Sequence, residues 1–255
     1  MLDQPLKIFC FDIIASTNQI LWQLLDAGIE PPLVAIARQQ TAGRGQWGRQ
    51  WQSSPGGLYL SLAFKPQIPA AAAPHLTLCS AWGIANSLRQ QKIPVQLKWP
   101  NDLTLQGRKL GGIKTETRVQ QGKISQAVIG VGINWSNPVP AVGINLQSFW
   151  QNCPHPPISS LEMLAAITIN GLLAGSRRYL LEGIDSLLPS YLELLENCGQ
   201  NVIVNGCPGV VVGVTTLGEL RVRFQASGAA TELTLPPGTI SLGYNQSDNF
   251  CPSSV

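Results

Sequence analysis

Histidine is scarce in this chain of 255 residues, which has only His75 and His155. Neither histidine lies at zinc-ligand spacing from a cysteine, and the six cysteines form no CxxC pair, so the sequence predicts no structural metal site. Nothing around either histidine has the pattern of a nucleophile turn, which argues against Ser-His-Asp and Cys-His hydrolase chemistry. The widely separated cysteines are expected to be reduced, buried thiols.

Long hydrophobic runs are also missing. No stretch is long and apolar enough to cross a membrane, and the N-terminus lacks the order of regions found in a signal peptide. Charged residues make up only 12% of the chain and hydrophobic residues 44%, so a real core can form. We therefore expect a soluble, cytoplasmic protein with no membrane association.

The charges that are present are distributed unevenly. Residues 38–123 carry twelve lysines and arginines against Asp102 and Glu116, whereas the rest of the chain is acidic on balance. Such a field concentrates anions over one region. A solvated basic face is the commoner cause of such a run, and a nucleotide or nucleic acid is the alternative, between which charge alone does not decide.

Hydrophobic periodicity predicts an α+β fold with a mixed or antiparallel sheet and packed helices. Ser16 and Gln19 match a capping box that opens a helix, and Gly28 is expected to close it. Further helices are predicted at residues 74–88, 160–181 and 184–196. Strands are predicted at residues 33–37, 58–64, 95–99, 103–105, 110–119 and 124–134.

The sequence changes in character after Gly199, where short β-rich pieces are separated by glycine and proline turns. Strands are predicted there at residues 201–204, 210–215, 219–224, 231–235 and 239–242. This pattern is typical of a small barrel that packs on a larger domain. We expect a catalytic domain at residues 1–197, a small barrel at 198–245 and a flexible tail at 246–255.

The most informative stretch is residues 98–113, which read KWPNDLTLQGRKLGGI. Lys98, Asp102, Arg108 and Lys109 lie there on a predicted strand, a tight turn and a second strand. These charged groups are expected to converge on a small anionic ligand, which the glycines at 111 and 112 would allow to approach the backbone. An ordinary strand end with a surface ion pair is the structural alternative.

Two other glycine-rich stretches stand out. Residues 43–48 match GxGxxG, but the sequence that follows cannot form the helix that a dinucleotide site requires, so we exclude NAD and FAD there. A P-loop sequence is absent. In the loop at 39–57, Arg44 and Arg49 are expected to hydrogen-bond a carboxylate or phosphate. The alternative is a surface loop in which Trp47 and Trp51 only pack against the rest of the protein. Gly130 and Gly132, inside a predicted strand, indicate a bulge or the close approach of a ligand.

Five of these segments in this order resemble the biotin protein ligase family. They are Ser16-Thr17-Asn18, Gln40-Thr41-Ala42-Gly43-Arg44-Gly45, Lys98-Trp99-Pro100-Asn101-Asp102, Arg108-Lys109-Leu110-Gly111-Gly112-Ile113 and Gly130-Val131-Gly132-Ile133-Asn134. The resemblance implies the biotin/lipoate ligase core, which is similar to class II synthetases, followed by an SH3-like barrel. It also implies a ligase that activates biotin with ATP to biotinyl-5′-AMP and transfers it to a lysine of a biotin carboxyl carrier protein.

The same resemblance implies roles for individual residues. Lys109, Arg44 and Asp102 would be catalytic, with Lys109 bridging the biotin carboxylate and the α-phosphate. Asp102 resembles a residue associated with Mg²⁺ and the reacting groups, and an equal alternative is that it supports these groups from behind or orients the lysine. Leu110 and Ile113 would be apolar walls for biotin. The implied biotin-binding residues are Ser16, Thr17, Asn18, Gln40, Gly43, Arg44, Lys109, Gly111, Gly112 and Ile113. The implied ATP-binding residues are Arg44, Arg49, Trp51, Lys98, Asn101 and Asn134.

This chain departs from the family pattern at two points. Gln46 stands where the family loop commonly has arginine, and Trp47 is expected to compensate by covering the intermediate. The chain also starts almost directly at the catalytic segment, so we expect no N-terminal DNA-binding domain and no sequence-specific DNA binding. A homodimer is compatible with the resemblance.

Two other functions compete with biotin ligation. A lipoate ligase shares the core by resemblance, but Ser16, Thr17 and Gln40 suit the paired hydrogen bonds of a ureido ring better than an extended lipoyl chain. An RNA-binding module would use the basic region and the aromatics Trp47, Trp51 and Trp99. That function leaves Asp102 and Lys109 without a role.

Overall fold

The structure is a computed structural model and describes residues 5–151, 153–226 and 229–244. Its strands are β1 (Lys7–Ile14), β2 (Leu33–Gln40), β3 (Gly57–Phe64), β4 (Ile68–Pro69), β5 (Gln96–Lys98), β6 (Asp102–Leu105), β7 (Arg108–Gln120), β8 (Lys123–Asn134), β9 (Asn201–Val204), β10 (Cys207–Val214), β11 (Leu220–Ala226) and β12 (Ala229–Leu235). Its α-helices are α1 (Thr17–Asp26), α2 (Ala73–Gln90), α3 (Leu146–Phe149) and α4 (Leu161–Leu192). Two short 3-10 helices are η1 (Gln46–Gly48) and η2 (Ala70–Ala72).

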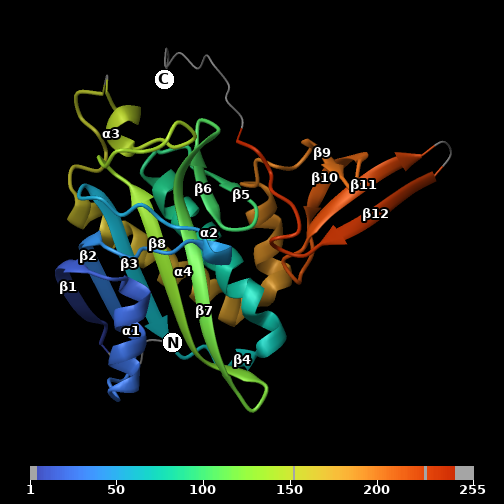
Figure 1. Cartoon of the computed structure of the whole chain (residues 1–255). Coiled ribbons are helices and arrows are strands. Elements are labelled where there is room, and N and C mark those ends of the chain that lie inside the picture. The colour runs from blue at the N-terminus through green and yellow to red at the C-terminus, as the bar shows by residue number, and fades with distance from the viewer. Residues whose placement is uncertain (1–4, 152, 227–228, 245–255) are drawn as a thin grey trace.

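The larger part is an eight-stranded sheet in the order β1-β2-β3-β8-β7-β6-β5, with the short β4 paired to β8. Strands β1 and β2 are parallel, and the other neighbours are antiparallel. Helices pack on both faces of this sheet (Figure 1). The architecture confirms the predicted α+β class with a mixed sheet. The edge strand β1 and the short helix α3 were not predicted.

Side-chain alternation along β2 explains how the two faces are covered. Leu33 and Ala35 point to one face, where they pack with Leu21 and Leu25 of α1. Val34 points to the other face and belongs to the main core, which α2 and α4 also form. In Figure 1, α1 lies in front of the sheet and α2 and α4 lie behind it. Because alternate residues face opposite layers, the first half of the strand is buried on both faces.

The ends of two helices agree with the sequence only in part. Helix α1 begins after Ser16 as predicted, but the Ser16 side chain accepts no capping hydrogen bond, so the predicted capping box is wrong. Gly28 has a φ of 81° and follows the helix, as predicted. Helix α4 is broken at Gly183, where φ is 81° and ψ is 176°, which confirms two helical pieces.

The C-terminal strands form a separate four-stranded sheet in the order β12-β11-β10-β9. Among the described residues this sheet is open, because β9 and β12 do not pair with each other, so the predicted closed barrel is not what the structure has. The predicted strand at 239–242 is also wrong, because these residues are irregular and lie against the larger part of the molecule. The predicted flexible tail lies outside the described residues.

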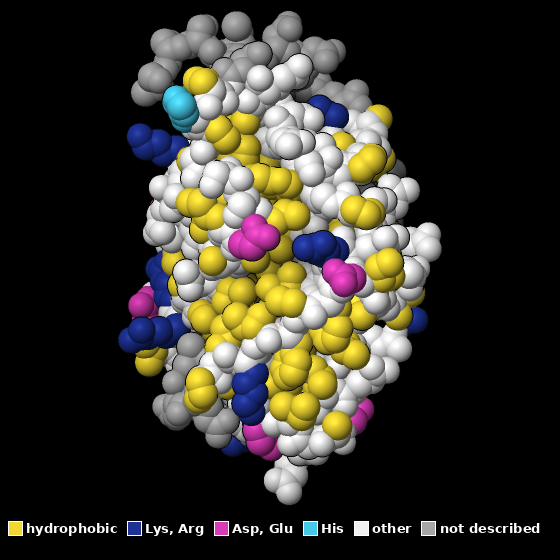
Figure 2. Space-filling view, turned by 90° about the vertical axis from the view of Figure 1, so that its left-hand side faces the viewer, with side chains coloured by type: hydrophobic (Ala, Val, Ile, Leu, Met, Phe, Trp, Pro, Cys, Tyr) yellow, Lys and Arg dark blue, Asp and Glu magenta, His cyan; other side chains and the backbone are white. Residues whose placement is uncertain are grey.

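Surface features add three findings. Among the described residues no helix is both long and apolar enough to cross a bilayer. The described cysteines are free thiols, but only Cys79 is buried, so the expectation of buried thiols holds for that residue alone. On the side shown in Figure 2, hydrophobic side chains form a band with a few basic and acidic side chains interspersed.

Candidate active site

A cavity of about 750 Å³ lies on the face of the sheet that carries α1. Its walls come from the N-terminus of α1, the loop after β2, the turn between β5 and β6, and the middle of β7 and β8. Residues 238–242, which follow the last strand, complete the lining. Segments that are far apart in the sequence therefore meet here because three neighbouring strands of one sheet present the same face.

One end of the cavity is a network of uncharged polar groups around the first turn of α1. The Thr17 backbone N–H and hydroxyl both donate to Gln40 Oε1, at 2.8 and 3.2 Å. The Gln40 amide donates to Ser53 Oγ at 2.9 Å, and the Ser61 hydroxyl donates to Asn18 Oδ1 at 2.6 Å. Asn18 Nδ2 is buried without a hydrogen-bond partner. An unpaired buried donor is costly, so this end is suited to a ligand with its own acceptor oxygen.

Glycines let the walls of the cavity come close together. A Cβ at Gly132 would lie 2.4 Å from Trp51 Nε1, and one at Gly43 would lie 2.5 Å from Ser53 Oγ. A Cβ at Gly130 would lie 2.2 Å from Asn18 Oδ1. Real Cβ atoms do not approach this closely, so any other residue at these positions would displace Trp51 or Asn18.

The other end of the cavity is charged. Lys109 Nζ lies 2.8 Å from Asp102 Oδ1 and 5.3 Å from the centroid of the Trp51 ring. Lys98 is buried nearby, and burial lowers its pKa more than the attraction of Asp102 raises it. Asp102 pairs with Lys109 and attracts Lys98, and Arg44 and Arg49 line the same cavity, so its positive charge favours the binding of an anion.

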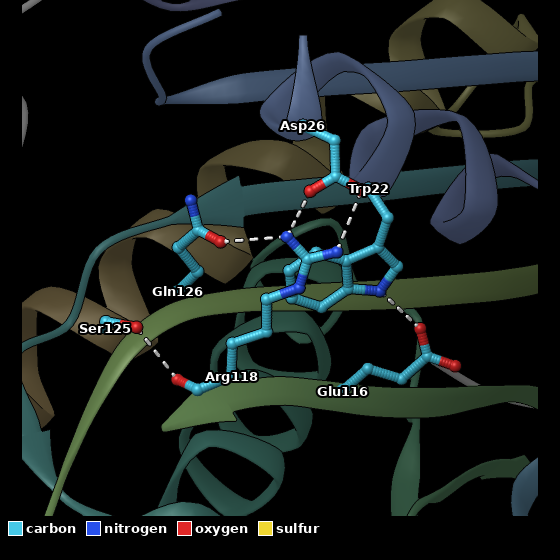
Figure 3. Close-up of polar contacts among 6 residues, drawn as sticks. All are labelled: Trp22, Asp26, Glu116, Arg118, Ser125 and Gln126. Carbon is cyan, nitrogen blue, oxygen red and sulfur yellow. Dashed lines mark hydrogen bonds and ion pairs between the residues drawn. The ribbon is translucent and has the colours of Figure 1, made fainter. Parts of the chain in front are cut away.

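A second charged cluster forms the wall between α1 and β7 (Figure 3). Trp22 Nε1 donates to Glu116 at 2.8 Å, and the Arg118 guanidinium lies 4.3 Å from the centroid of the Trp22 ring while it pairs with Asp26. Burial acts to raise the pKa of Glu116, but hydrogen bonds from Trp22 and Lys114 lower it below its ordinary value. The cluster holds α1 against β7 and so fixes the width of the cavity.

A smaller cavity of about 340 Å³ lies beside the first one, and Trp51 and Lys109 line both. Asn134 lies in the second cavity, where its amide donates to the backbone oxygens of Lys109 and Ile144 at 3.3 and 3.2 Å. Residues 137–143 supply much of the remaining wall. Lys109 is thus placed where ligands in the two cavities would meet.

The structure brings most of the predicted site residues together. Those that line the larger cavity are Ser16, Thr17, Asn18, Gln40, Arg44, Arg49, Trp51, Lys98, Asn101, Asp102, Lys109, Gly112 and Ile113. Gly43 lies behind this lining, in contact with Ser53 and Trp51, and Gly111 packs against the backbone of β8. Asn101 also stabilises the position of β7, because its Nδ2 donates a hydrogen bond to the backbone oxygen of Ile113 at 2.8 Å.

The predicted apolar wall is placed differently. The Leu110 side chain is fully buried in the main core, and the Ile113 side chain is only 1% exposed in the same core. Lys114 and Glu116 lie on the cavity face of β7, whereas the pairing of β6 with β7 skips Leu110, and this register shift leaves the Leu110 side chain in the core. Ile113 packs in the core and also reaches the cavity lining. The apolar residues that line the cavity include the indoles of Trp22, Trp47 and Trp51.

Several lining residues were missed by the sequence analysis. Lys114 and Glu116 follow Gly112 at intervals of two along β7, so strand alternation could have found them. Trp22 lies one helical turn after Asn18 and could have been found in the same way. No local signal points to residues 238–242 or to Tyr244, because the chain reaches the cavity there through a long-range return.

Comparison with known proteins agrees with this geometry. Residues 10–134 match the Biotin/lipoate A/B protein ligase family. The chain is 43% identical to the bifunctional ligase/repressor BirA of Escherichia coli strain K12 over 124 residues. This alignment covers 48% of this chain and 38% of that protein. It is 33% identical to the biotin–[acetyl-CoA-carboxylase] ligase of Paracoccus denitrificans over 113 residues, an alignment that covers 43% of this chain and 47% of that protein. The matched segment thus spans less than half the length of these relatives.

Solved structures share the fold over more of the chain. The biotin protein ligase of Aquifex aeolicus in complex with biotin and ATP aligns with a TM-score of 0.73 at 20% identity, covering 94% of this chain and 99% of that one. The biotin protein ligase of Leishmania major in complex with biotinyl-5-AMP aligns with a TM-score of 0.61 at 20% identity, covering 90% and 99%. Residues 10–134, which supply most of the lining of the larger cavity, are thus similar to the Biotin/lipoate A/B protein ligase family, and the chain has the fold of the solved biotin protein ligases.

Proposed function

We propose that this protein is a biotin protein ligase that uses ATP to activate biotin as biotinyl-5′-AMP. The observation that carries the proposal is the position of Lys109, which lines both cavities and whose ammonium pairs with Asp102 at the charged end. The uncharged polar network around Thr17 and Gln40 at the other end suits the ureido ring of biotin. The family match and the relatives described above support the same reaction.

The adenylation step joins two anions, so its main obstacle is charge repulsion. A biotin carboxylate oxygen attacks the α-phosphorus of ATP, a new O–P bond forms, and the bond to the departing pyrophosphate breaks. The Lys109 ammonium would lie between the carboxylate and the α-phosphate and would stabilise the charge in the transition state. Arg44, Arg49 and Lys98, which line the same cavity, would bind the phosphate oxygens.

The two cavities suggest how the substrates are arranged. Biotin would occupy the larger cavity with its carboxylate toward Lys109, and the nucleoside of ATP would occupy the smaller cavity beside Asn134. The phosphates would then cross the shared wall at Lys109 and Trp51. Trp47, which is 50% exposed at the rim, would cover the mixed anhydride and limit its hydrolysis.

The described residues do not offer a preformed Mg²⁺ site. No three acidic, histidine or cysteine residues cluster there, and both oxygens of Asp102 already have partners, Lys109 and Tyr244. Hard cations require several oxygen ligands. We therefore derive no step from an ion held by protein ligands, and Mg²⁺ enters this proposal only as the usual counterion of ATP.

In the second step a lysine of a biotin carboxyl carrier protein would attack the acyl carbon of biotinyl-AMP, forming an amide and releasing AMP. The relative from Paracoccus denitrificans is described as a ligase for acetyl-CoA carboxylase, which supports a carrier of that kind. Cytoplasmic localisation, a homodimer and the absence of DNA binding remain predictions from the sequence.

A lipoate ligase is the second candidate, because the family model includes both activities. A lipoyl chain would need an extended apolar tunnel, whereas the inner end of this cavity is lined by Thr17, Asn18 and Gln40. Isothermal titration with each acid separates the two functions. Tighter binding of lipoate than of biotin would refute the biotin assignment.

The decisive test is biotin-dependent exchange of labelled pyrophosphate into ATP. Lys109→Ala should lower the exchange rate about 100-fold or more while the protein stays folded, because a preorganised charge at the transition state is lost. Lys123→Ala, at the exposed start of β8, is the matched control and should exchange at the wild-type rate. Wild-type exchange by a folded Lys109→Ala protein would refute the assigned role.

A further inference from the structure

The chain returns to the larger cavity after its last strand. Residues 238–242 line the cavity, Leu242 is buried, and Ile240 packs against the main core. Trp47 lies against Gly238, where a Cβ would be 2.8 Å from the indole Nε1. We call residues 238–244 the C-terminal segment. It is held by the core on one side and by the rim of the cavity on the other.

Tyr244, at the end of this segment, contacts the charged end of the cavity. Its hydroxyl donates a hydrogen bond to Asp102 Oδ2 at 2.5 Å. The Lys98 ammonium lies 3.7 Å from the centroid of its ring, within the range of a cation–π interaction. One aromatic side chain therefore touches both the carboxylate and one of the two lysines that surround it.

The consequence for Asp102 is that each carboxylate oxygen has a different partner. Oδ1 binds the Lys109 ammonium at 2.8 Å, and Oδ2 accepts from Tyr244. Burial is the largest of the effects that raise the pKa of Tyr244, so the hydroxyl stays protonated and remains a donor. The terminal torsion of an aspartate is soft, and a carboxylate held at only one oxygen can turn to follow the ammonium.

We propose that Tyr244 is a positioning residue for the activation of the substrate acid and that it acts through Asp102 on Lys109. This role rests on the proposed function. The hydroxyl fixes the carboxylate so that Lys109 binds a single oxygen and keeps its remaining N–H groups directed at the substrates. The ring holds the C-terminal segment in place beneath Lys98.

Tyr244→Phe in the full chain tests the role of the hydroxyl, because the variant keeps the ring and removes only the donor. We expect kcat of biotin-dependent pyrophosphate exchange to fall about tenfold or more, with KM for biotin and ATP within about twofold of wild type. Tyr179→Phe is the matched control. It removes a hydroxyl that lies 2.8 Å from His75 Nδ1 in a contact outside the cavity lining, and it should keep the wild-type kcat.

A double-mutant cycle tests whether the effect passes through Asp102. Tyr244→Phe should cause no further loss of kcat in an Asp102→Asn background, because the carboxylate that it orients is gone. Wild-type kcat in Tyr244→Phe, or losses that multiply in the double variant, would overturn the positioning role.

The same measurements separate this role from the proposed function. An inactive wild-type chain would overturn the function and the positioning role together. An active wild type with an unaffected Tyr244→Phe variant would overturn only the positioning role.

Discussion

Single glycines of β8 determine how close the cavity walls come. Gly130 and Gly132 were interpreted from the sequence as either a bulge or a point of close approach. Strand β8 pairs in unbroken register with both β3 and β7 at these positions, so no bulge is present there. The reason for the glycines is the close approach of Asn18 and Trp51, two side chains that line the cavity.

Gly132→Ala should lower the free energy of unfolding by about 1–3 kcal/mol, because the new methyl group would overlap the Trp51 indole at 2.4 Å. Gly112→Ala is the matched substitution on the neighbouring strand, where the nearest atoms would lie at 3.5 Å. At that position alanine fits and also restricts the conformations of the unfolded chain, so the free energy of unfolding should stay unchanged or rise slightly. Urea denaturation measures both, and equal stability of the two variants would contradict the steric argument.

Among the larger elements, α2 and α4 pack at backbone distance. A Cβ at Gly83 of α2 would lie 2.1 Å from the oxygen of Gly171, and one at Gly175 of α4 would lie 2.0 Å from the oxygen of Cys79. Glycine lowers helix stability, so three glycines inside two helices are explained by this crossing. The pair forms the layer behind the sheet and supports the strands that carry the site (Figure 1).

Gly175→Ala separates helix propensity from packing. Propensity alone predicts stabilisation by about 1 kcal/mol, whereas the contact with the Cys79 oxygen predicts destabilisation by about 1–3 kcal/mol or more. We expect the second outcome in thermal or urea unfolding. The neighbouring exposed Ala174→Gly variant should lose only about 1 kcal/mol, as a surface helix position does. A stabilised Gly175→Ala protein would show that the helices separate at little cost.

The sequence predicted most elements of the larger part because their hydrophobic periods are clear. Strands β3, β7 and β8 alternate or are continuously apolar, and α2 has a core-facing stripe. The edge strand β1 was missed because it is largely exposed, so its hydrophobic residues do not alternate with polar ones in a pattern that indicates one buried face. The segment at 239–242 was wrongly predicted as a strand. Its apolar residues pack against the core and line the cavity, and they do not pair with another strand.

Many of the residues that line the larger cavity lie in the local motifs that the sequence analysis singled out. The residues of 98–113 and of the loop at 39–57 meet because β3 and β7, which flank or carry them, lie on either side of β8 in one sheet. Which face a strand residue occupies was less clear, so Leu110 was assigned to the ligand instead of the core. Tyr244 could not be inferred, because its contact with Asp102 joins parts of the chain that share no regular element.

At the scale of the whole molecule, a few polar contacts join the C-terminal sheet to the larger part. Trp99 Nε1 donates to the Gly218 oxygen at 2.9 Å, and the Trp99 backbone N–H donates to Asn197 Oδ1 at 2.9 Å. His75 of α2 contacts the Thr216 oxygen through Nε2 at 2.5 Å and the Tyr179 hydroxyl of α4 through Nδ1. These contacts form a joint between the two sheets.

The His75 contact predicts a dependence of stability on pH. Burial lowers the pKa of His75 below its ordinary value of 6.5, although the Thr216 carbonyl and the charge of Asp185 act to raise it. The unfolded chain therefore binds a proton more readily, so stability is full above pH 6.5 and is lost as the pH falls from there toward the folded-state pKa. The unfolding midpoint should be lower at about pH 5.5 than at about pH 7.5.

His75→Gln should flatten this dependence, because glutamine keeps a donor for the Thr216 oxygen but does not titrate in this range. The matched control is His155→Gln, at an exposed position, which should retain the wild-type slope between the two pH values. Thermal unfolding of both variants and the wild type at each pH gives the comparison. A slope that persists in His75→Gln would assign the pH response to another group. Protonation of His75 at the joint between the two sheets would then not control the stability of the protein in this pH range.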